Sequence, residues 1–240
     1  MERYVLIFIL CFAGSLIQGS LSFGYGIFVM SVLSLILPLK TTSVLVAISS
    51  LFISFTVCCK LRGKINYKAI WLPLAAGLLF IPIGVYILGI CNENALKKIL
   101  GASIILMAVF FLTTVGKTVP IKTNIKNQLL AGMTSGIFNG LFNMGGPPLV
   151  FYLAHTIEDS LSYKASLEFI FIVSGVIVLI SHGICGNFTA EIIPYVILSF
   201  FATIIGSILG LKIFARLDKK ILTSTIDWLM LGLGVILILN

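Results

Sequence analysis

The chain has 240 residues, of which 59% are hydrophobic and only 10% are charged, with a net charge of +8 and a mean hydropathy of +1.17. Soluble domains carry about 25% charged residues, so this composition excludes an ordinary soluble protein. The apolar runs are uniform rather than alternating, which excludes a transmembrane β-barrel. The basic residues fall in short loops beside these runs, where they set orientation in a lipid bilayer rather than bind nucleic acid. The composition predicts a multi-pass protein of the cytoplasmic membrane.

Eight apolar runs follow one another, and most have a length near 20 residues, enough to cross a bilayer as a helix. In chain order they span residues 4–37, 41–59, 69–90, 95–116, 128–154, 165–181, 192–211 and 221–239. The first and the fifth are too long for one simple span. Each is interrupted by glycine, in the stretches "GSLIQGSLSFGYGIF" (14–28) and "SGIFNGLFNMGGPPLVFYL" (135–153). We expect each stretch to break a helix.

An internal repeat relates these two breaks. A shift of 121 positions brings Gly19 onto Gly140, Gly24 onto Gly145, Val29 onto Val150, Pro73 onto Pro194 and Gly89 onto Gly210. We therefore predict one transmembrane domain over residues 1–240, with internal repeats at 1–118 and 127–240. Each repeat contains a broken segment followed by three continuous spans.

Loop charge indicates how the repeats are inserted. If each broken segment crosses once, the 16 Lys and Arg residues divide equally between the two sides. If each broken segment enters and returns on the same side, twelve of these residues gather on one side, with Lys164 counted in the loop before the sixth run, and four lie on the other. We then assign the side with twelve to the cytoplasm. Arms of about eleven to fifteen residues are also short of a full crossing. The expected fold is an all-α integral membrane protein with two inverted repeats, each a glycine-broken, re-entrant helical hairpin followed by three transmembrane helices. Inversion also follows if each arm crosses fully, and this alternative stays open.

The breaks are the candidate binding site. Unpaired backbone groups at bilayer depth must be buried in protein or face a watery cavity, and half-helices that begin there direct amides and positive dipole ends at a solute, which favours an anion. Close helix packing is the competing explanation for the small and polar residues of these stretches. The predicted substrate-binding residues are Gln18, Gly19, Ser20, Ser22, Gly24, Gly26, Asn139, Gly140, Asn143, Gly145, Gly146 and Pro147.

Few ionisable residues lie within the runs. Asp227 and Glu168 are candidates for coupling transport to a proton or sodium ion, because charge inside a membrane helix is a sign of function. An interfacial position is the alternative for Asp227. We expect His155 and His182, at the ends of spans, to be solvated or to cap helices. The cysteines show no metal-ligand spacing, so no metal or other cofactor is expected.

At "GSLSFGYGIF" and "SGIFNGLFNMGGPPLVFYL" the sequence resembles the sulfite exporter TauE/SafE family of membrane transporters, and the similarity covers essentially the whole chain. The first stretch lacks the proline that follows the glycines of the second. The resemblance implies transport of sulfite, sulfonates or related organic anions.

We therefore predict a secondary transporter for a small anion, and we expect the two breaks to bind this anion at the bilayer midplane. An intramembrane enzyme acting on a lipid or quinone, or a passive anion channel, is the alternative. The sequence leaves open the solute, import or export, the coupling ion and any homo-oligomer.

Overall fold

The computed structural model describes residues 2–114, 124–213 and 219–239, and its regular elements over this range are all helices. The first half contains α1 (Glu2–Leu21), α2 (Tyr25–Leu33), α3 (Leu39–Leu61), α4 (Tyr67–Ile90) and α5 (Glu93–Thr114). The second half contains α6 (Ile125–Phe142), α7 (Gly146–Ala154), α8 (Ser160–Ile184), the short η1 (Ala190–Ile192), α9 (Ile193–Ile213) and α10 (Lys219–Leu239). Each half therefore follows the same order: a long helix, a short helix and three long helices.

The helices have the length and surface of a membrane protein. Among the described residues, α1, α3, α4, α8 and α9 together with η1 are long and apolar enough to cross a bilayer. Their outward faces are apolar as well, as Trp71, Leu79 and Tyr86 on α4 illustrate, all strongly exposed. Such a surface is unfavourable in water and suits contact with lipid. The predicted class of helical integral membrane protein is confirmed.

Both long apolar runs are broken at the predicted stretches. The first break separates α1 from α2, and its Ser22 and Gly24 have φ angles of 73° and 107°. The second break separates α6 from α7, and here Asn143 takes the left-handed conformation with a φ of 55°. The helix α7 begins at Gly146 with prolines in its first turn, where a missing backbone N–H removes no helical hydrogen bond.

The predicted length of eleven to fifteen residues for each arm is wrong. The first arms, α1 and α6, have 20 and 18 residues, whereas the returning arms, α2 and α7, have nine each. At 1.5 Å per residue the first arms reach about 27–30 Å and the returning arms about 14 Å. The first arms are longer because the helix continues through Gly19 and Ser20, whose small side chains are accommodated against a neighbouring helix.

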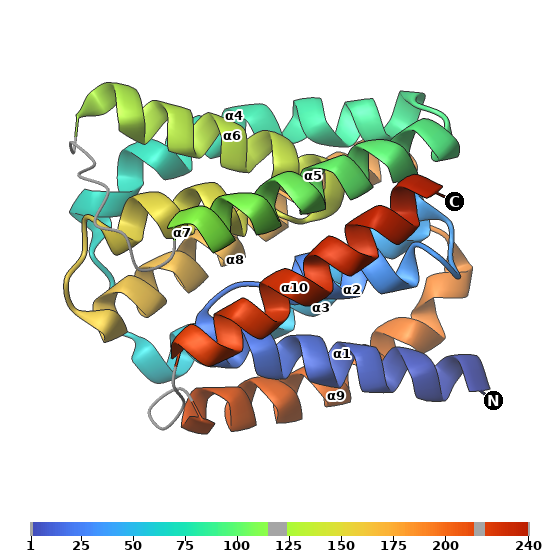
Figure 1. The fold of residues 1–240 in the computed structure, drawn as a ribbon, viewed down its shortest axis with the longest axis horizontal. Coiled ribbons are helices and arrows are strands. Elements are labelled where there is room, and N and C mark those ends of the chain that lie inside the picture. Colours follow the sequence, from blue (N-terminus) through green and yellow to red (C-terminus); the bar gives the residue numbers. More distant parts are fainter. Residues whose placement is uncertain (1, 115–123, 214–218, 240) are drawn as a thin grey trace.

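Helices from the two halves pack in an exchanged pattern. Helix α1 lies against α9, and α6 lies correspondingly against α4, while α3 packs with α8 and α5 packs with α10. Figure 1 shows that α1 and α2 form a hairpin open toward the end of the molecule where α1 begins, and that α6 and α7 form a hairpin open toward the opposite end. This exchange is the arrangement that inverted repeats would produce, and we retain the duplication of residues 1–118 and 127–240 as a proposal.

Candidate functional site

The two helix breaks touch each other in the middle of the helical bundle. Gly26, in the first turn of α2, lies so close to the second break that an added Cβ would fall on the carbonyl oxygen of Asn143. Glycine is therefore required at position 26 for the two hairpins to approach this closely.

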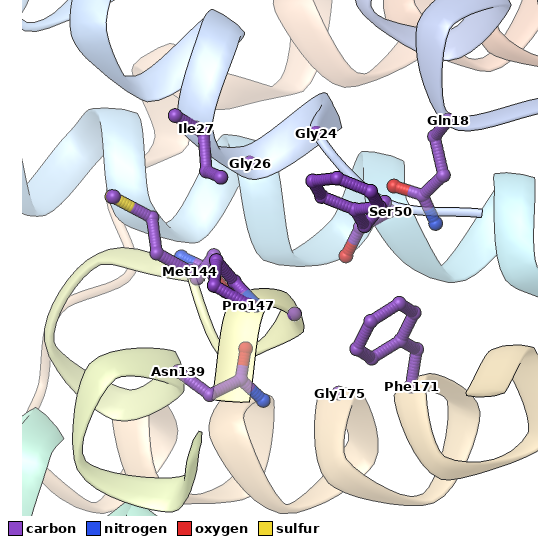
Figure 2. Close-up of a pocket in the computed structure, with 13 residues that line it drawn as sticks. Gln18, Gly24, Gly26, Ile27, Ser50, Asn139, Met144, Pro147, Phe171 and Gly175 are labelled. Atoms are coloured by element: carbon purple, nitrogen blue, oxygen red, sulfur yellow. The ribbon is translucent and has the colours of Figure 1, made fainter. Parts of the chain in front are cut away.

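A cavity lies beside this contact (Figure 2). Both breaks supply its walls, and α3 and α8 complete it; the lining residues are Gln18, Phe23, Gly24, Gly26, Ile27, Ser50, Asn139, Asn143, Met144, Gly146, Pro147, Phe171 and Gly175. The space open to the centre of a water-sized sphere is about 30 Å³. One water needs about 10–15 Å³ of such space, so the cavity has room for roughly two or three waters. A larger solute requires the two breaks to separate slightly.

The predicted site residues divide into two groups. Those that line the cavity are Gln18, Gly24, Gly26, Asn139, Asn143, Gly146 and Pro147. Those that lie next to it without lining it are Gly19, Ser20, Ser22, Gly140 and Gly145. Gly19, Ser20 and Gly140 face neighbouring helices, whereas Ser22 and Gly145 lie in the breaks themselves.

Helix packing accounts for three residues of the second group. An added Cβ on Gly19 would lie 2.7 Å from the Ser207 carbonyl oxygen of α9, and the Ser20 hydroxyl donates to the Gly210 carbonyl oxygen at 3.2 Å. Gly140 faces α4 in the same way, with its added Cβ 3.0 Å from the Gly84 Cα. These small residues let membrane helices pack with their backbones close together.

The other two residues stabilise the breaks. The Gly145 carbonyl oxygen accepts a hydrogen bond from Ser135 Oγ at 2.7 Å, within the second hairpin. Ser22 Oγ accepts one from Lys164 Nζ at 3.1 Å, across to α8.

Lys164 supports the broken end of α1. Its ammonium is fully buried and also donates to the Gly19 carbonyl oxygen at 2.6 Å. This carbonyl belongs to the last turn of α1, where the negative end of the helix dipole attracts a cation. Counting Lys164 with a charged loop is therefore wrong, because the residue lies inside α8; removing it leaves eleven basic residues against four and preserves the predicted orientation.

Glu168 lies one turn further along α8 and is also fully buried. Its Oε2 accepts a hydrogen bond from Gln18 Nε2 at 3.1 Å, and Gln18 Nε2 also contacts Ser54 Oγ at 3.4 Å. Within the described part of the chain, Glu168 Oε1 has no hydrogen-bond partner. Glu168 is connected to the cavity through Gln18, which lines it.

The other coupling candidate, Asp227, belongs to α10, but its side chain lies outside the described residues.

A neutral chain of polar groups lies behind the second break. Asn143 Nδ2 donates to the carbonyl oxygen and to Oγ of Ser43, both at 2.9 Å, and Ser43 Oγ lies 3.2 Å from His182 Nε2. His182 Nδ1 lies 3.0 Å from Asn187 Nδ2, which can only donate. The expectation that His182 is solvated or caps a helix is wrong, because the ring is fully buried in this chain. His155 is exposed and contacts the Phe151 carbonyl oxygen at the end of α7, as expected of a capping residue.

Sequence reasoning missed the roles of Lys164, Ser43 and His182. One signal was available for Lys164: it stands four residues before Glu168, so the two lie on the same face of a membrane helix. No comparable signal existed for Ser43 and His182, because serines are frequent in α3 and the two residues that meet are 139 positions apart.

Helices α2 and α7 both begin beside the cavity. Their N-cap residues, Gly24 and Gly145, make no side-chain hydrogen bond to the first turn. The positive dipole ends of two half-helices therefore meet beside the same space. The first break also offers the amide of Gly26, whereas Pro147 and Pro148 carry no backbone N–H. Such an arrangement attracts an anion without a buried lysine or arginine in the wall.

Comparison with known proteins agrees with this geometry. The family model described as "Sulfite exporter TauE/SafE" matches residues 6–240. A protein of Cupriavidus necator described as a probable sulfite/organosulfonate exporter TauE is 23% identical over 235 residues, which cover 95% of this chain and 90% of the relative. No solved structure matches the chain.

Proposed function

Because the chain belongs to the sulfite exporter TauE/SafE family, we propose that it is a secondary transporter that carries sulfite, a sulfonate or a related small organic anion across the cytoplasmic membrane. The relative from Cupriavidus necator supports this substrate class by its description. The membrane location is supported by the long apolar helices. The side assigned to the cytoplasm rests on the loop charges predicted from the sequence.

The observation that carries the proposal is the meeting of two uncapped half-helix N-termini at one cavity. Backbone amides there supply hydrogen-bond donors, and the two helix dipoles add positive potential. Asn139 also lines this space, and its side-chain amide carries a neutral donor. An anion held by dipoles and amides can be released more easily than one paired with a full positive charge.

The contact between the hairpins suggests how the path opens. Gly26 and Asn143 touch, and the cavity beside them is small. A sulfite or sulfonate ion therefore binds as the hairpins move apart. Movement of one half of the molecule against the other around a central site is the usual form of alternating access in transporters with inverted repeats.

The test is transport of labelled sulfite and methanesulfonate into proteoliposomes that contain the purified chain. We expect saturable uptake that is accelerated by unlabelled anion on the opposite side, which a passive channel does not show. Uptake that is absent for both anions, or that shows no such acceleration, would contradict the proposal.

Gly26→Val and Gly89→Ala form a matched pair for the site. The valine side chain at position 26 would clash with the Asn143 carbonyl oxygen, so transport should fall to background. A Cβ at Gly89 meets nothing within 4 Å, so Gly89→Ala should transport like the natural protein. Gel filtration in detergent checks that both variants are folded.

A further inference from the structure

The buried carboxyl of Glu168 has an asymmetric environment. Oε2 accepts the hydrogen bond from Gln18, and the Ser54 hydroxyl also interacts with the carboxyl, whereas Oε1 is buried and has no hydrogen-bond partner among the described residues. A carboxylate has several acceptor positions, and leaving one unsatisfied in a membrane interior is unfavourable. This environment can therefore accommodate a proton on the carboxyl.

The Gln18 amide connects this carboxyl to the cavity. While Glu168 is ionised it can only accept, so it must face the nitrogen of Gln18, which also contacts Ser54. The amide oxygen of Gln18 then points toward the other residues that line the cavity (Figure 2). A carbonyl oxygen directed at the cavity repels an anion.

Lys164 adds a second electrostatic connection. Its ammonium is fixed by Gly19 and Ser22 and interacts electrostatically with Glu168. Ionised Glu168 and charged Lys164 together are neutral, whereas a protonated Glu168 leaves one net positive charge behind the first break. An anion in the cavity compensates that charge.

We propose that Glu168 takes up a proton when the anion binds, and that Gln18 transmits this change to the cavity by turning its amide. The inference rests on the proposed transport of an anion. A proton from the acid form of the buffer in the surrounding solution adds to the carboxylate oxygen that faces Gln18, and the new O–H donates to the Gln18 oxygen. The Gln18 nitrogen then faces the cavity and donates to the anion. Proton and anion therefore bind together.

The other groups around Glu168 do not replace it in this role. In the described part of the chain, the titratable side chains that interact with Glu168 are Lys164 and Tyr163 on α8 and Cys58 on α3. The segment of α1 that faces it contributes Gln18, which does not titrate. Glu168 is in direct hydrogen-bond contact with Gln18, which lines the cavity.

The test measures proton uptake when methanesulfonate is added to the purified protein in weakly buffered detergent solution. A sulfonate stays ionised across the acidic-to-neutral range, so the proton change belongs to the protein. We expect uptake that approaches one proton per bound anion, and an affinity that rises by up to about tenfold for each unit of decreasing pH.

Glu168→Gln separates this inference from transport itself. The new amide can donate to the Gln18 oxygen without a proton, so the variant should exchange anion across the membrane while its binding takes up no proton and its affinity no longer depends on pH. Equal proton uptake in Glu168→Gln and the natural protein would overturn the inference, although anion exchange by both would leave the proposed function intact. Glu93→Gln, at an exposed carboxylate paired with Lys97, is the control and should retain full proton uptake.

Gln18→Met tests the relay with Glu168 in place. Methionine has a similar shape but no amide, so the dependence of affinity on pH should become flatter. A dependence as steep as that of the natural protein would overturn the role of Gln18.

Discussion

The two helix breaks solve the same structural problem with different chemistry. The first break has two residues with positive φ, Ser22 and Gly24, and its open carbonyl end is held by the ammonium of Lys164. The second break has one such residue, Asn143, whose side chain is bound by neutral Ser43. One break is stabilised by charge and the other by neutral hydrogen bonds.

This difference suggests different roles for the two breaks. Lys164 and Glu168 come from α8 in the second half of the chain, yet they lie behind the first break, where Gln18 connects the buried carboxyl to the cavity. The proton uptake that we propose would therefore act at the first break. At the second break, the prolines restrict the backbone at the start of α7, and Asn143 is held by two hydrogen bonds to Ser43. An internal duplication would thus have kept the interruption of the helix while the residues behind it diverged.

The largest effect should come from removing the charge at the first break. Lys164→Met leaves Glu168 without its buried counter-charge and the Gly19 carbonyl without its partner, so we expect a loss of about 3–5 kcal/mol in stability. Thermal unfolding in detergent measures it. Lys164→Met combined with Glu168→Gln removes both charges and should recover part of the loss. A Lys164→Met protein as stable as the natural one would remove the contrast between the breaks.

An intermediate effect is expected at the second break. Asn143→Ala loses both hydrogen bonds to Ser43, which should lower the free energy of unfolding by about 1–3 kcal/mol. It also places alanine at a φ of 55°, and this left-handed backbone should lower the free energy of unfolding by a further amount of about 1–2 kcal/mol. Asn143→Gly loses the same hydrogen bonds without backbone strain and should be the milder change by that second amount. The same unfolding assay compares them, and equal losses would show that the left-handed backbone contributes nothing.

The smallest effect should come from Pro147→Ala. The proline lies in the first turn of α7, where its substitution breaks no helical hydrogen bond and costs only about 0.4–1 kcal/mol through a more flexible unfolded chain. The alanine also restores one backbone N–H beside the cavity, which makes the second break more like the first. Methanesulfonate affinity, measured by calorimetry, should therefore stay equal or rise slightly; a marked fall would contradict a site built on backbone amides.

The sequence by itself determined the class of protein, the positions of most helices and the two interruptions. These features depend on local properties: the length of an apolar run, the backbone freedom of Gly24 and the restricted φ of Pro147. Seven of the twelve site residues that the sequence predicted line the cavity.

Only the tertiary structure decided which small residues face the cavity and which face a helix. Gly19 and Gly26 look equivalent along the chain, yet the first contacts α9 and the second contacts Asn143. Lys164 looked like a loop residue because its partner, the Gly19 carbonyl, is 145 residues away. Packing between distant helices sets both outcomes, because the direction of a side chain and the compensation of a buried charge depend on neighbours that the local pattern does not specify.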